Sequence, residues 1–123
     1  EKARGFVFSQ IARLAQRLEA TPEGAGNMLD NTVIIYMSDA PDTHHSTAYE
    51  WPLAIVGNVK GQLKLGGRYL SFPGYGKPGH FTMSTFYSTL LRCVGGRQET
   101  FGQLDSDLDV KTMQSGPLPA ILA

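Results

Sequence analysis

The sequence has a single cysteine, no long apolar run and no net charge. Cys93 cannot form an internal disulfide, and its apolar neighbours in a predicted helix favour a buried structural thiol over a reactive one. No apolar run approaches the ~20 residues that a membrane-spanning helix needs. Eleven basic residues balance eleven acidic ones, so charge does not point to a nucleic-acid or anionic-membrane partner.

What is present is typical of one folded, loop-rich domain. The 123 residues suffice for a single domain, and a 41% hydrophobic content supports a folded core. The 14 glycines and 7 prolines are more than a compact helical domain needs. We therefore expect short regular elements separated by irregular segments.

Apolar spacing predicts a mixed α/β chain. Helical periodicity indicates an amphipathic helix over residues 3–20, and the β-branched run at 32–37 indicates a strand buried on both faces, as in a parallel sheet. A second strand is predicted at 51–56. A second helix is predicted at 82–94, with Met83, Tyr87, Leu90, Leu91 and Val94 on its apolar face and Gly95-Gly96 as its cap. Two helices on two or three strands make a thin core, so we expect a piece of a larger α/β domain, or one half of a split one.

The loop after the first strand gathers possible metal ligands. Asp39 lies at the end of the strand, Asp42, His44 and His45 come shortly after it, and Glu50 is a further candidate for the set. Carboxylates with imidazoles suit zinc, manganese or iron, whereas a carboxylate-dominated set suits calcium or magnesium. Adjacent histidines point in different directions, so at most one of the pair binds the ion. The alternative is that Asp39 caps the loop through backbone N–H groups and the histidines are exposed.

Two further groups are candidate binding residues. His80 precedes the second helix and is a weaker metal candidate, since loop histidines are more often surface residues. Lys60, Lys64 and Arg68 surround a glycine-rich segment that could cradle an anion. No phosphate-loop pattern accompanies them, so an ordinary turn is the favoured interpretation.

Two strings resemble the late part of sulfatases and alkaline-phosphatase-like proteins: DNTVIIYMSD at residues 30–39 and WPLAIVG at residues 51–57. In those proteins a strand after Asp-Asn-Thr ends in Ser-Asp, and a later strand begins at a proline. The chain is more similar still to an uncharacterised bacterial family of that superfamily, named for an HXXSHH signature. That family also shows a lysine- and glycine-rich excursion, a late helix, a Phe-Gly pair and a Gly-Pro-Leu-Pro ending, as at residues 61–69, 82–94, 101–102 and 116–119 here.

The resemblance implies an alkaline-phosphatase-like α/β/α sandwich, of which residues 1–123 form a single partial domain at the C-terminal end. It implies a protein exported to the periplasm or outside a bacterium, and metal-assisted hydrolysis of phosphate or sulfate esters. Asp39 matches a metal-binding acid, and His45, with Asp42 and His44 as weaker candidates, would add ligands for a zinc, calcium or manganese ion. The superfamily's Ser, Thr or modified Cys nucleophile lies in an N-terminal part. We expect that part to precede Glu1 or to belong to a partner subunit.

Two departures from the family leave a second hypothesis open. Ala40-Pro41 follows Asp39, where sulfatases have Asn or His and the HXXSHH family has Glu-x-Gly, and the signature itself is absent. A metal without its nucleophile cannot run the covalent mechanism, so these 123 residues alone are expected to show no hydrolase activity. No catalytic residue is assigned. The alternative is a structural or accessory subunit that retains the fold only.

Overall fold

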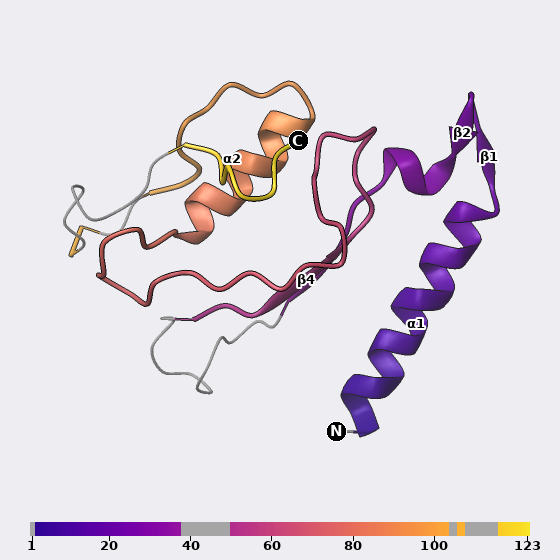
Figure 1. Cartoon of the computed structure of the whole chain (residues 1–123), viewed down its shortest axis with the longest axis horizontal. Helices are drawn as coiled ribbons and strands as arrows, with labels where there is room; N and C mark the ends of the chain where they lie inside the picture. The colour runs from indigo at the N-terminus through magenta and orange to yellow at the C-terminus, as the bar shows by residue number, and fades with distance from the viewer. Residues whose placement is uncertain (1, 38–49, 104–105, 108–115) are drawn as a thin grey trace.

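The computed structural model describes residues 2–37, 50–103, 106–107 and 116–123. Within these ranges the chain is a mixed α/β protein with two α-helices, a 3-10 helix and two small antiparallel sheets of two strands each (Figure 1). The elements, in order, are α1 (Lys2–Glu19), β1 (Pro22–Glu23), β2 (Gly26–Asn27), η1 (Met28–Asn31), β3 (Ile34–Met37), β4 (Leu53–Val56) and α2 (Met83–Cys93).

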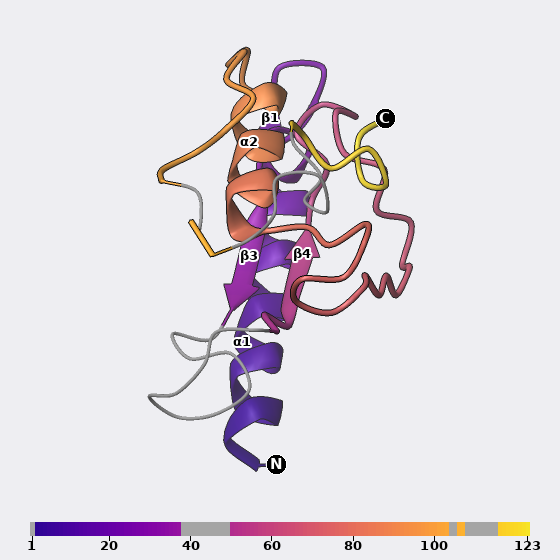
Figure 2. The same cartoon turned by 90° about the vertical axis from the view of Figure 1, so that its left-hand side faces the viewer.

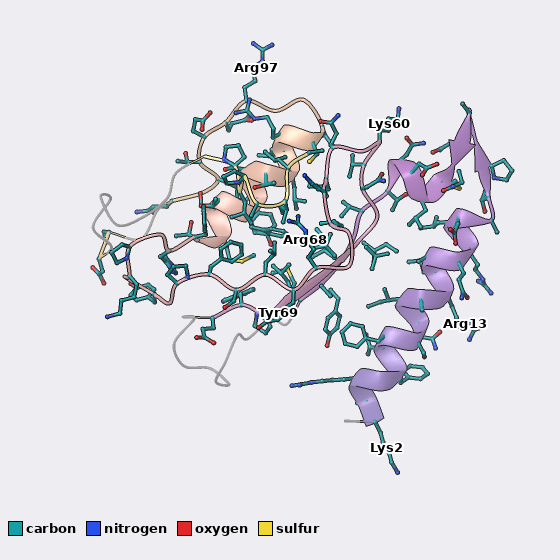
Figure 3. The ribbon with its side chains drawn as sticks, viewed as in Figure 1. Lys2, Arg13, Lys60, Arg68, Tyr69 and Arg97 are labelled. Carbon is teal, nitrogen blue, oxygen red and sulfur yellow. The ribbon has the colours of Figure 1, made fainter. Side chains whose placement is uncertain are left out.

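Helix α1 confirms the predicted first helix but packs loosely. It ends at Glu19, and the hydroxyl of Thr21 donates to the carbonyl of Arg17 at 2.7 Å. None of its residues is buried, although Phe8 meets Tyr36 of β3 at 4.9 Å between ring centroids. Arg13 points away from the rest of the molecule (Figure 3). The helix is amphipathic, but its apolar side is only partly covered.

The Asp-Asn-Thr tripeptide before β3 is used in local hydrogen bonds. Asn27 Oδ1 accepts the Asp30 N–H at 3.1 Å, and Asp30 Oδ2 accepts the Asn27 N–H at 3.0 Å, which is a reciprocal capping box at the start of η1. Asn31 donates to the carboxylate of Glu23, and the Thr32 hydroxyl donates to the Met28 carbonyl at 2.6 Å. These side chains fix the turn that aims the chain into β3.

Strand β3 lies where the sequence predicts it, but its pairing and burial differ from the expectation. It pairs with β4 antiparallel, with Met37 opposite Leu53, and all four of its residues are only half-buried. The expected parallel, doubly buried strand is therefore wrong for the described residues. One face of the pair packs on the core through Ile35, Leu53 and Ile55. The apolar run correctly predicted a strand, but it did not specify which strand would pair with it or in which direction.

Helix α2 confirms the predicted second helix, with Thr82 as its N-cap and Val94 as its C-cap. The predicted apolar face is wrong in part, because Val94 is 73% exposed. The buried side chains are instead Thr85, Phe86, Ser88 and Thr89. Small hydroxyl-bearing residues on this face allow the C-terminal segment to approach the helix closely.

The core lies between α2, the segment after β4 and the C-terminal segment. Its buried hydrophobic residues are Leu63, Phe86, Leu118 and Ile121. The C-terminal segment is tied down by backbone bonds from Lys64 N–H to the Ile121 carbonyl (2.8 Å) and from Ala123 N–H to the Gln62 carbonyl (3.0 Å). This apolar tail packs against the chain's own helix α2 and the segment after β4.

No helix in the described part of the chain combines the length and the apolar character needed to cross a membrane.

Thr89 joins the C-terminal segment to α2. Its side chain is fully buried, its hydroxyl donates to the Thr85 carbonyl at 2.7 Å, and the same oxygen accepts the Leu118 N–H at 2.7 Å. We expect Thr89→Val, which keeps the shape but removes the acceptor, to lower the free energy of unfolding by about 1–3 kcal/mol, because a buried N–H is left unpaired. Urea unfolding measures this. Thr21→Val, at an exposed hydroxyl, is the control and should change stability by less than about 0.5 kcal/mol. Equal stability of the two variants would contradict the role given to Thr89.

Gly57 ends β4 in a conformation that only glycine adopts readily. Its φ is +95°, and a Cβ placed there would overlap the Thr32 carbonyl oxygen. We expect Gly57→Ala to cost about 2 kcal/mol or more in unfolding free energy, from backbone strain together with that overlap. Gly5→Ala is the matched control, since Gly5 lies in α1 with open space around it. That change should cause no loss, because alanine is the better helix former. Chemical denaturation of both variants distinguishes them.

Candidate functional site

The predicted metal ligands Asp39, Asp42, His44 and His45 lie outside the described residues, so that set stays a prediction. The structure does place both ends of the segment that carries them. β3 ends at Met37 and β4 begins at Leu53, and these two residues pair directly, so the strands that flank the segment meet at the same end of the sheet. Tyr87 of α2 donates its hydroxyl to Met37 Sδ at 3.8 Å, which ties this end of β3 to the helix.

His80 is described, and it is buried rather than on the surface. It is 8% exposed, its Nδ1 lies 3.3 Å from the Pro73 carbonyl oxygen, and its ring meets Tyr75 edge-on at 5.6 Å between centroids. A carbonyl oxygen only accepts, so this contact favours the tautomer with the proton on Nδ1 and leaves Nε2 as an acceptor. The sequence predicts a surface position for a histidine in a loop. In the structure the turn at 74–77 folds the loop back over the ring, so the side chain is buried.

His80 is not part of a described metal cluster. Among the described residues, no three His, Cys, Asp or Glu side chains lie close enough together to hold an ion. His80 therefore has no such set of partners in this part of the chain. The structure assigns it instead to the wall of a groove.

The groove has a volume of about 1150 Å³ and runs beside β4. One wall is formed by residues 50–55, and the opposite wall by residues 67–75. His80 and the N-terminal turn of α2 also line it. In Figure 2 the chain that follows β4 runs on the side of β4 away from β3, as this lining requires. Much of the lining is aromatic or aliphatic, including Trp51, Tyr69, Leu70, Phe72, Phe81 and Phe101.

No motif in the sequence predicts this groove. Residues 61–79 form turns and irregular backbone, with one isolated bridge from Leu63 to Leu122. The signal in the sequence that could have indicated a binding surface is the aromatic residues of this segment. Tyr69 and Phe72 are large, exposed side chains in a stretch without periodicity. Tyr69 is 92% exposed, and Leu70 and Phe72 beside it in the sequence are exposed as well.

Arg68 acts as a structural cation. Its Nε donates to the Leu65 carbonyl at 3.0 Å, and Nη2 donates to the carbonyls of Lys64 and Ala120, the latter at 2.7 Å. Figure 3 shows Arg68 and Tyr69 directed to different sides of this segment. The guanidinium thus joins the glycine-rich turn to the C-terminal segment. This agrees with the favoured interpretation of an ordinary turn over an anion cradle.

No protein-family model, no curated protein and no solved structure matches this chain. The resemblance to alkaline-phosphatase-like proteins therefore remains a prediction from the residues that carry it. What the geometry adds is the placement of β3 and β4 and the groove beside them.

Cys93 is half-buried at the end of α2, and burial raises the pKa of its thiol, partly opposed by a backbone hydrogen bond. A raised pKa leaves less thiolate at a given pH, and the thiolate is the reactive form. We expect iodoacetamide to alkylate Cys93 more slowly in the folded protein at pH 8 than in urea-unfolded protein. The folded rate should still be rising at pH values where N-acetylcysteine has levelled off. Mass spectrometry follows the reaction, and equal folded and unfolded rates would contradict this description.

Proposed function

We propose that this chain is the C-terminal part of an exported alkaline-phosphatase- and sulfatase-like protein that carries a metal-assisted ester hydrolase site. The supporting observation is the placement of the residues that flank the candidate segment. The antiparallel pairing of β3 with β4 holds Met37 and Leu53 opposite each other, so the polar sequence between them, with its carboxylates and imidazoles, starts and finishes at one end of that sheet. Binding residues are common on segments that join the elements of a rigid scaffold.

The donor chemistry of that segment suits a divalent cation. Asp39 and His45 would hold the ion, with Asp42 and His44 as further ligands, and mixed carboxylate and imidazole donors fit zinc or manganese, with calcium as the oxygen-rich alternative. When bound, such an ion supplies Lewis-acid polarisation of an ester oxygen and stabilises a nucleophile as an anion. The nucleophile would come from polypeptide outside this chain.

A second function is supported by the exposed apolar side of α1. Phe6 is 65% exposed and Leu14 is nearly half exposed, and α1 has no buried residue at all. Apolar side chains gathered on one helix favour packing against further protein. The chain would then act as a structural or accessory subunit that keeps the fold without the chemistry.

Metal analysis of the purified native protein separates the two functions. We expect stoichiometric zinc, manganese or calcium by elemental mass spectrometry, and at least tenfold weaker metal binding by titration calorimetry in Asp39→Asn and in His45→Ala, because each removes a ligand. Asp107→Asn changes an exposed carboxylate outside the candidate segment and should leave metal binding unchanged.

Intact mass is measured on the same sample, with phosphate- and sulfate-ester hydrolysis as the activity readout. Metal with ester hydrolysis in a protein much heavier than 13.4 kDa would support the hydrolase. If the protein contains no metal and Asp39→Asn has the same metal content and activity as wild type, the hydrolase proposal is wrong and the accessory subunit is favoured.

A further inference from the structure

β4 has one paired edge and one open edge. It pairs with β3 on one side, and within the described ranges no strand pairs with its other side. No backbone hydrogen bond between described residues joins residues 50–56 to the segment that faces them across the groove. In a strand, alternate N–H and C=O groups point to each side, so the open edge presents donors and acceptors that another extended chain would match.

The groove follows this open edge. Its one wall consists of consecutive residues 50–55, and its volume of about 1150 Å³ exceeds the roughly 300–1,000 Å³ usual for small-molecule sites. The four residues of β4 extend over about 13 Å. A space of this size beside an open strand edge is suited to an extended peptide more than to a compact ligand.

The opposite wall offers apolar contacts for alternate side chains of such a peptide. Tyr69, Leu70 and Phe72 all line the groove and all remain exposed. His80 adds an acceptor, because Nδ1 is engaged by the Pro73 carbonyl and Nε2 has no hydrogen-bond partner among the described residues. A peptide N–H donor would satisfy it.

The charged residues that line the groove favour a positively charged ligand. Among the described lining residues, Arg68 is the basic side chain and Glu50 is the acidic one. Arg68 already donates to three backbone carbonyls. Glu50 is exposed and forms no ion pair with any described residue. The groove therefore ends in one free negative charge, which a basic residue would complement.

We propose that the open edge of β4 binds an extended segment of a partner protein by strand addition, with apolar side chains at alternate positions and a lysine or arginine beside Glu50. Backbone hydrogen bonds would supply affinity, and the aromatic wall with Glu50 would supply selectivity. This proposal does not depend on Asp39, Asp42, His44 or His45, because it uses only Glu50, β4, residues 67–75 and His80.

The test is a selection of random octapeptides displayed on phage against the full chain. We expect enriched peptides with apolar residues at every second position and a basic residue at one end. Synthetic copies should lose at least tenfold in affinity when alternate backbone nitrogens on one edge are methylated, since that removes donors and keeps side chains. Hydrogen exchange should show new protection of amides within Leu53–Val56 when the peptide is bound.

Charge reversal tests the second part of the proposal. Glu50→Lys should weaken the basic peptides about fivefold and strengthen their acid-substituted copies, while Glu19→Lys, on α1 away from the groove, should change neither. The proposal is overturned if no peptide is enriched, or if N-methylated and unmethylated peptides bind equally. It is also overturned if the free protein is a dimer in sedimentation whose β4 amides are already protected, since a second copy would then occupy the edge.

Discussion

The fold depends on the contact between the hydroxyl-bearing face of α2 and the C-terminal segment. A helix that buries Thr85, Ser88 and Thr89 presents little apolar area, so close approach and hydrogen bonding must compensate. Thr89 provides this by bonding the helix carbonyl behind it and the Leu118 N–H in front of it. With Leu118 and Ile121 held there, Leu63 and Phe86 gain the neighbours that make them core residues. The last residues of the chain thus complete a core whose other parts were assembled much earlier in the sequence.

The same packing fixes the sheet. Ile35, Leu53 and Ile55 lie against this core, which leaves the other face of β3 and β4 for Tyr36 and its contact with Phe8 of α1. The pair is therefore anchored firmly on one side and weakly on the other. Two strands alone are marginally stable in water, so the core side must carry the sheet. The open edge of β4 and the groove beside it follow directly from a sheet that stops after two strands in the described part of the chain.

Local signals in the sequence predicted the local structure well. Helical spacing located α1 and α2, the glycines at 95 and 96 marked the end of the second helix, and short apolar runs located β3 and β4. Partner choice was not predictable in this way, since an apolar run such as 34–37 specifies burial and not strand direction. The polar buried face of α2 was also missed, because hydrophobic periodicity weights leucine over threonine. Of the site, the sequence indicated the metal candidates and His80, whereas the groove required segments far apart in the chain to be brought together.

The capping box at Asn27 and Asp30 shows that a sequence motif can have a structural role without a catalytic one. Asp30, Asn31 and Thr32 are the residues of the tripeptide that most resembles alkaline-phosphatase-like proteins, and each is engaged in a hydrogen bond within the turn before β3. In this chain the three residues stabilise the turn that precedes β3. A polypeptide could therefore exchange every metal ligand downstream and still need these three residues in order to fold. In this protein the tripeptide fixes a turn, so activity has to be judged on the residues that follow the strand.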